Sequence, residues 1–154
     1  MLLPSVKTFS KEYDSIYKQA ELIFLKSNIC EWKYVNESFT CIVNRNNTSI
    51  KINESDGCCI PVCKYPNDFN DNTIKRKQHN SKKGCNIKSL KCKLHVCKYL
   101  RESNSLKTIE AIKEIDGLRN NFRIKYDVIW KSISFGTPKR IWIDFYKMYK
   151  NIFK

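Results

Sequence analysis

The chain has 154 residues, a formal net charge of +14 and 42% hydrophobic residues. This length suits one domain with a modest core, and the apolar share excludes a chain that is too polar to fold. The positive charge favours encounter with nucleic acid or an anionic membrane and opposes self-association. Charged residues from Lys7 to Asp14 interrupt the N-terminal apolar residues, so we expect neither a secretory signal nor a membrane span. We predict a single cytoplasmic domain over residues 1–154.

The first predicted element is a helix from about Ser10 to Lys26, with Ser10 as its N-cap. Apolar residues recur there at three- and four-residue intervals, which is typical of one buried helical face. These residues are Tyr13, Ile16, Tyr17, Ala20, Ile23 and Phe24.

An alternating apolar pattern follows and predicts a small antiparallel sheet, a meander from about Glu31 to Asn53. Residues 44–47 supply the turn between its last two strands. The alternating residues are Trp32, Tyr34, Phe39, Cys41, Val43, Ile50 and Ile52. The in-phase position of Cys41 favours core packing for its thiol.

The last third of the sequence predicts three helices. The first has an apolar face from Leu106 to Ile115 and is expected to end at Gly117. A short helix follows near Trp130. The last begins at Thr137-Pro138, with Thr137 as N-cap and Pro138 at the first helical position. Its predicted buried stripe is Ile141, Phe145, Tyr149 and Ile152. The elements together predict an α+β fold.

Cysteines are concentrated in residues 57–100, around a polar, basic segment from 66 to 84 that we expect to be a mobile loop. The six central cysteines are Cys58, Cys59, Cys63, Cys85, Cys92 and Cys97. Because cytosolic thiols are kept reduced, these residues are predicted metal ligands. Four thiolates suit zinc, which we favour, or an iron–sulfur cluster. Disulfides and unligated buried thiols are the alternatives.

Two further residues are candidate ligands beside this set. If residues 90–100 are helical, His95 shares a face with Cys92, whereas Cys97 points elsewhere unless the helix bends. His95 is equally well explained as a partly exposed helix residue. Cys30 follows the first helix, and the sequence favours a role as metal ligand and a role in the core equally.

The double cysteine Cys58-Cys59, the later Cys63-Lys64-Tyr65 and the segment Gly84 to Ile87, followed by Cys92 and Cys97, resemble the YkgJ-type cysteine-cluster family. These small bacterial proteins are described as zinc or iron chelators. The resemblance covers about residues 57–99. The chain departs from the family pattern at Ile52 and Ser55, which stand where upstream family cysteines would be, and at Leu90-Lys91, which replaces an Arg-Pro step. The resemblance implies metal binding by the six matched cysteines and no particular reaction.

The cysteine-rich region is also strongly basic. Residues 64–107 contain twelve Lys or Arg and three Asp or Glu. Such a surface could hold phosphates, which makes nucleic-acid binding, as in a repair accessory protein, an alternative function. The duller explanation is that lysines offset the charge of bound thiolates. The candidate contacts are Lys88, Lys91, Lys93, Lys98 and Arg101.

No motif of enzyme chemistry is present: the sequence lacks a Gly-rich phosphate loop, a nucleophile elbow, a HExxH helix and a C-x-x-C pair. We therefore predict a metal-binding protein in which the metal is chiefly structural, and we do not predict an enzyme. A secreted disulfide-bonded protein is the third alternative, because an even cysteine count is also typical of that class.

Overall fold

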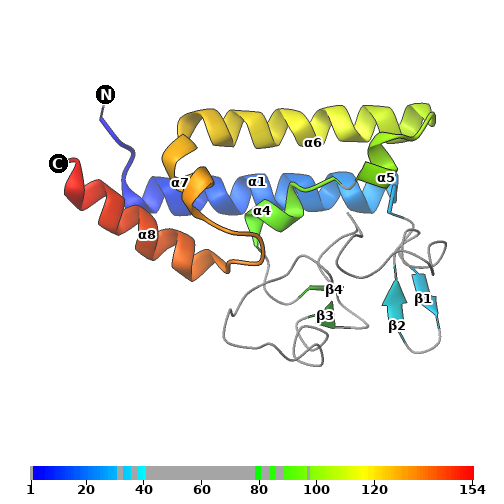
Figure 1. The fold of residues 1–154 in the computed structure, drawn as a ribbon, viewed down its shortest axis with the longest axis horizontal. Coiled ribbons are helices and arrows are strands. Elements are labelled where there is room, and N and C mark those ends of the chain that lie inside the picture. Colours follow the sequence, from blue (N-terminus) through cyan, green and yellow to red (C-terminus); the bar gives the residue numbers. More distant parts are fainter. Residues whose placement is uncertain are drawn as a thin grey trace.

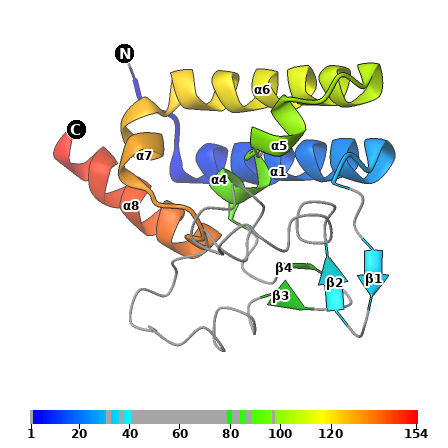
Figure 2. The ribbon, with the colours of Figure 1, turned by 45° about the vertical axis from the view of Figure 1, so that its right-hand side comes forward.

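A computed structural model describes residues 2–30, 33–35, 38–40, 79–80, 84–85, 89–96 and 98–154. Its helices are α1 (Val6–Ser27), α4 (Leu90–Lys93), α5 (Lys98–Arg101), α6 (Leu106–Lys125), α7 (Asp127–Ser132) and α8 (Lys139–Ile152). The two long helices α1 and α6 lie side by side, and α8 crosses one end of this pair (Figure 1, Figure 2). The short helix α7 lies between α6 and α8, and the short helix α4 packs against α1 (Figure 1).

The predicted α+β fold is wrong, because the part of the chain that the structure describes is mostly helical. The short strands β1 (Lys33–Val35) and β2 (Ser38–Thr40) pair antiparallel, with Tyr34 opposite Phe39. The second pair joins β3 (His79–Asn80) to β4 (Gly84–Cys85). These strand pairs of three and two residues are too short to form a layer of the fold. Most of the predicted meander, from residue 41 to 53, lies outside the described residues, as does most of the predicted loop over 66–84.

Helix α1 begins earlier than predicted. Ser5 is the N-cap, and its hydroxyl accepts the N–H of Thr8 at 3.0 Å. The helix ends at Asn28, whose left-handed backbone (φ 45°) allows its N–H to reach the carbonyl of Phe24 at 2.8 Å. The predicted apolar face is confirmed at Tyr13 and Ala20, which are buried.

Helix α6 does not end at Gly117, as the sequence predicted, but continues to Lys125. A glycine inside a helix costs about 1 kcal/mol, which is less than the gain from burying Phe122 further along. Gly117 is exposed, and a Cβ there would meet nothing within 4 Å. The glycine therefore weakens the helix slightly without stopping it.

Helix α8 buries a side that is rotated from the predicted stripe, of which Phe145 and Tyr149 pack partly buried against the core. Trp142 and Tyr146 are fully buried, whereas Ile152, placed in the predicted stripe, is 68% exposed. The N-cap is Pro138 rather than Thr137. The reason lies in the neighbouring helices, because the large rings of Trp142 and Tyr146 meet aromatic residues of α1, α6 and α7.

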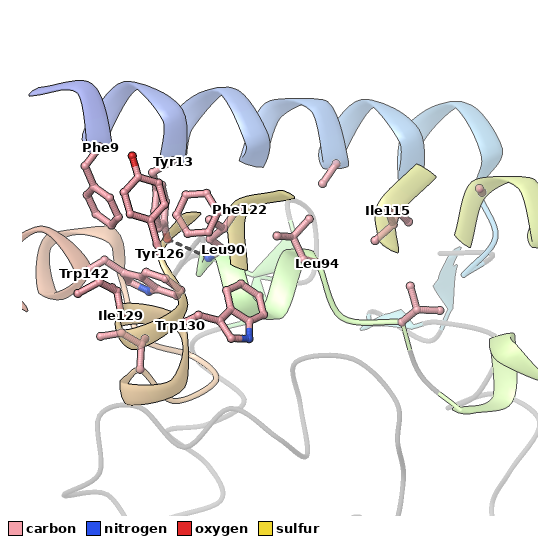
Figure 3. Close-up of a cluster of buried hydrophobic side chains, with 14 of the residues drawn as sticks. Phe9, Tyr13, Leu90, Leu94, Ile115, Phe122, Tyr126, Ile129, Trp130 and Trp142 are labelled. Atoms are coloured by element: carbon pink, nitrogen blue, oxygen red, sulfur yellow. Dashed lines mark hydrogen bonds between the residues drawn. The ribbon is translucent and has the colours of Figure 1, made fainter. Parts of the chain in front are cut away.

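The core is an aromatic cluster where α1, α6, α7 and α8 meet (Figure 3). The rings of Phe9 and Tyr146 stack with centroids 4.2 Å apart, and Tyr126 meets Phe9 edge-on at 4.8 Å. Such ring pairs contribute about 0.5–1.5 kcal/mol each beyond the area they bury. The hydroxyl groups of two of these residues also donate hydrogen bonds. Tyr126 donates to the carboxylate of Glu12 at 2.6 Å, and Tyr146 donates to the carbonyl of Pro4 at 2.7 Å.

Because these tyrosines are buried, we expect the folded protein to become less stable at alkaline pH. Burial raises the pKa of Tyr13, Tyr126 and Tyr146 above the ordinary value of 10.0. Above pH 10 these tyrosines lose their protons more readily in the unfolded chain than in the folded protein. Their contribution to the free energy of unfolding is therefore complete below pH 10 and is lost as the pH rises above it. For the buried Tyr13 this loss is about 1.4 kcal/mol per pH unit while its hydroxyl stays protonated.

The check is the free energy of unfolding in urea, measured at neutral pH and at several pH values above 10. The decrease in the free energy of unfolding per pH unit should be smaller in Tyr13→Phe, which has one ionisable group fewer. A free energy that stays constant through this range in the unmodified protein would contradict the prediction.

Candidate functional site

The predicted cysteine ligands are divided between described and undescribed parts of the chain. Cys58, Cys59, Cys63 and Cys97 lie outside the described residues. Cys85 is the last residue of β4, and Cys92 lies within α4. Among the described residues, no group of three or more His, Cys, Asp or Glu side chains could hold a metal ion.

Cys92 is a half-buried residue at the edge of the helical frame. Its Sγ accepts the backbone N–H of Gly136 at 2.9 Å. Gly136 lies in the turn between α7 and α8 with φ 80°, a left-handed conformation that a residue with a Cβ rarely adopts. The turn thus directs an amide dipole at the sulfur, and such a hydrogen bond favours the thiolate over the thiol.

Lys91 connects the same short helix to α7. Its ammonium group donates to the carbonyls of Trp130 at 2.9 Å and Ile133 at 2.8 Å. It also lies 5.3 Å from the ring centre of Trp130 and 5.5 Å from that of Phe135. Burial lowers the pKa of Lys91, while the negative charge of a Cys92 thiolate opposes that change. A cation held beside the sulfur is a second influence that favours the thiolate.

Helix α4 is also fixed to α1. The N–H of Leu90 donates to the hydroxyl of Tyr13 at 2.8 Å, and the side chain of Leu90 is fully buried, as is that of Leu94 (Figure 3). Four residues cannot form a stable helix alone, so these contacts supply the order of α4. Cys92 is consequently held by a rigid support made of α1, α7 and the turn before α8.

Ser89, the residue before α4, has a buried side chain that is 2% exposed. Its Oγ has no hydrogen-bond partner in the part of the chain that the structure describes. A buried hydroxyl without a partner costs about 1–3 kcal/mol, and such groups are found where an ion or water completes the site. Ser89 lies three residues before Cys92.

The two additional candidate ligands have different environments. A continuous helix over 90–100 does not form, because α4 ends at Lys93 and α5 begins only at Lys98. His95 lies in the break, half-buried, with its ring edge-on to Phe135 at 5.3 Å. Cys30 is 3% exposed within the hydrophobic core. This burial among apolar side chains favours the core-packing role for Cys30.

Several of the predicted phosphate-binding residues have intramolecular contacts. Arg101 forms two hydrogen bonds with the carboxylate of Asp116, at 3.0 and 2.8 Å, and these lower the pKa of Asp116. Lys93 lies over the rings of Tyr17 and Phe24. Lys88 and the side chain of Lys98 are outside the described part of the chain. Nucleic-acid binding remains an untested alternative for which these contacts give no support.

The roles of Lys91 and Gly136 were missed by sequence reasoning. The sequence places Lys91 among the lysines of a basic surface and gives Gly136 no role. Only the Phe-Gly-Thr-Pro run at 135–138 signals a tight turn. No local pattern indicates that this turn reaches a sulfur atom 44 positions earlier in the chain.

Within the described ranges, every helix is too short or too polar to pass through a lipid bilayer. Comparison with protein-family models, curated proteins and solved structures gave no match. The resemblance to cysteine-cluster chelators therefore remains a prediction from the sequence.

Proposed function

We propose that the chain is a small metal-binding protein in which central cysteines hold a structural metal ion. Zinc is favoured over an iron–sulfur cluster, because zinc accepts histidine as well as thiolate ligands, whereas the common clusters need four thiolates. The proposed ligands are drawn from Cys58, Cys59, Cys63, Cys85, Cys92 and Cys97. None of them is given a catalytic role.

The observation that carries the proposal is the environment of Cys92. Metals bind the thiolate, and the amide of Gly136 together with the ammonium group of Lys91 favours that form. Hydrogen bonds to a ligating atom also fix its orientation, and such supporting groups are a regular part of metal sites. Cys92 is half-buried, and the N–H of Gly136 anchors its sulfur.

The orphaned hydroxyl of Ser89 agrees with this interpretation. A buried Oγ close in sequence to a ligand can donate to a metal-bound sulfur or to a water near it, which removes the cost of leaving it unpaired. The donor set, which is rich in thiolates, suits a borderline-soft divalent ion and does not suit magnesium or calcium.

A bound metal would supply coordination that joins segments far apart in the sequence, and its binding free energy would add to the free energy of folding. Helix α4 would hold the Cys92 ligand in a fixed position. Tyr13 and Lys91 hold α4 against α1 and α7, so a metal ligated by Cys92 would connect the cysteine-rich segment to the helical frame.

The test is the metal content of protein purified without added metal, compared with that of Cys85→Ser and Cys92→Ser. Both substitutions should lower the bound metal to well below one equivalent and reduce the melting temperature, since oxygen replaces a preferred sulfur ligand. Cys30→Ala is the matched control. It removes a thiol from the core, so it should lower stability while leaving the metal content unchanged.

The proposal fails if both ligand variants keep the metal content and the melting temperature of the original protein. Thiol titration under denaturing, non-reducing conditions with a chelator distinguishes the disulfide alternative. A metal site releases its thiols to the reagent, whereas disulfide bonds keep them unreactive.

A further inference from the structure

The final turns of α8 extend past the beginning of α1. Tyr146 donates its hydroxyl hydrogen to the carbonyl of Pro4, and its ring stacks on Phe9, so Tyr146 lies level with the start of α1. Helix α8 continues from there to Ile152, and both views show this part projecting beyond the paired long helices (Figure 1, Figure 2). We call residues 147–154 the α8 overhang.

One side of the α8 overhang is apolar and exposed. Met148 is 52% exposed and Ile152 is 68% exposed, and a spacing of four residues places them on the same side of the helix. Phe153, which follows the helix, adds a 65% exposed ring. Large apolar residues gathered at one end of a molecule indicate an interaction surface, unlike single scattered ones.

The opposite side of the α8 overhang is basic. Lys147, Lys150 and Lys154 are three and four residues apart, so they share a helical face. Lys147 and Lys154 are exposed, and Lys150 is half-exposed. Residues 147–154 contain no Asp or Glu. Two acidic side chains of α1 are bound to lysines, Glu12 to Lys125 and Asp14 to Lys139.

This distribution identifies the kind of surface that could cover the overhang. A second copy of the chain would bring two molecules of net charge +14 together, which is electrostatically unfavourable. A projecting helix with one apolar side and one lysine-rich side is the typical form of an interfacial helix, which lies in the headgroup layer of an anionic bilayer. Lysine side chains reach phosphates with their ammonium groups while their methylene stems stay on apolar surface.

We propose that the α8 overhang binds the surface of anionic lipid bilayers. Met148, Ile152 and Phe153 enter the headgroup region, and Lys147, Lys150 and Lys154 attract the negative surface. This binding is independent of the cysteine-rich segment and would add a membrane location to a metal-binding protein. It requires no membrane-spanning helix.

The test is sedimentation of the full chain with vesicles of phosphatidylcholine alone and with added phosphatidylserine. We expect binding to the anionic vesicles that weakens with added salt and is much weaker on neutral vesicles. Ile152→Ser/Phe153→Ser should reduce the partition coefficient about tenfold or more, since two large apolar side chains are lost from the interface. Circular dichroism should show unchanged helix content, because both residues are exposed.

Two matched controls separate the overhang from general hydrophobicity and charge. Leu22→Ser/Leu25→Ser removes two exposed leucines at the other end of α1 and should leave binding unchanged. Lys147→Gln/Lys150→Gln should weaken binding on the order of tenfold, whereas Lys107→Gln/Lys113→Gln on α6 should have a much smaller effect.

The proposal is overturned if the original protein does not bind anionic vesicles at low salt, or if Ile152→Ser/Phe153→Ser binds as tightly as the original. It is also overturned if sedimentation without lipid shows a dimer that the same variant abolishes, because the overhang would then bind a second copy. Loss of metal in the cysteine variants bears only on the metal site and leaves this result unchanged.

Discussion

Replacing Trp142 with alanine is expected to lower the free energy of unfolding by about 3–5 kcal/mol. The side chain is fully buried, with ring centroids 5.5 Å from Tyr13, 6.2 Å from Phe122 and 6.0 Å from Trp130. Its Nε1–H also donates to the carbonyl of Thr137 at 3.1 Å. The substitution would leave a large cavity where α1, α6, α7 and α8 meet, together with an unpaired carbonyl.

A loss of this size is a large share of the about 5–15 kcal/mol by which domains are usually stable. The measurement is urea unfolding followed by far-ultraviolet circular dichroism. Phe153→Ala is the matched control, because this aromatic residue of α8 is 65% exposed and should change stability by no more than about 0.5 kcal/mol. A loss below about 1 kcal/mol for Trp142→Ala would show that α8 does not pack on the core as described.

The second large effect is expected from Lys91→Met, which should cost about 3 kcal/mol. The ammonium group is the donor for the carbonyls of Trp130 and Ile133 near the C-terminal end of α7. A cation at a helix C-terminus is favourable in itself, and removal of this one leaves two partly buried acceptors without this donor. Methionine keeps most of the aliphatic volume, so the change isolates the charge and its hydrogen bonds.

Lys93→Met is the appropriate comparison, because both lysines lie on α4. The ammonium group of Lys93 lies 5.4 Å from the ring centre of Tyr17 and 5.8 Å from that of Phe24, contacts worth about 0.5–1 kcal/mol each. The loss for Lys91→Met should therefore clearly exceed that for Lys93→Met in the same urea titration. Equal losses would contradict the assignment of Lys91 as the link between α4 and α7.

Comparison of the Lys91 and Trp142 variants separates the stability of the helical frame from the proposed metal site. If Lys91 acts by holding α4 in place and by favouring the thiolate of Cys92, its removal should weaken metal binding as well as the fold. Trp142→Ala should destabilise the frame with a smaller direct effect on metal affinity, since Trp142 has no described contact with Cys92.

The sequence by itself determined most of the helices. Apolar intervals predicted α1, α7 and α8 because helix formation depends on residues three and four apart, which any linear inspection can see. The same local signals were weaker at helix ends. Ser5 was passed over as the N-cap of α1, and Gly117 was taken as a stop although its cost of about 1 kcal/mol is easily exceeded by packing. The alternating residues after α1 were over-interpreted as a sheet.

Only the tertiary structure decided which side of α8 is buried and what surrounds Cys92. The contacts involved join residues far apart in the chain: Tyr13 and Leu90 are separated by 77 positions, and Cys92 and Gly136 by 44. A contact at such a separation is selected by the packing of whole helices against each other, because ring size and shape choose the partner. Composition and spacing identified cysteine as the chemically important residue type, whereas the amide and the ammonium group that favour its thiolate come from elements that the sequence does not associate with it.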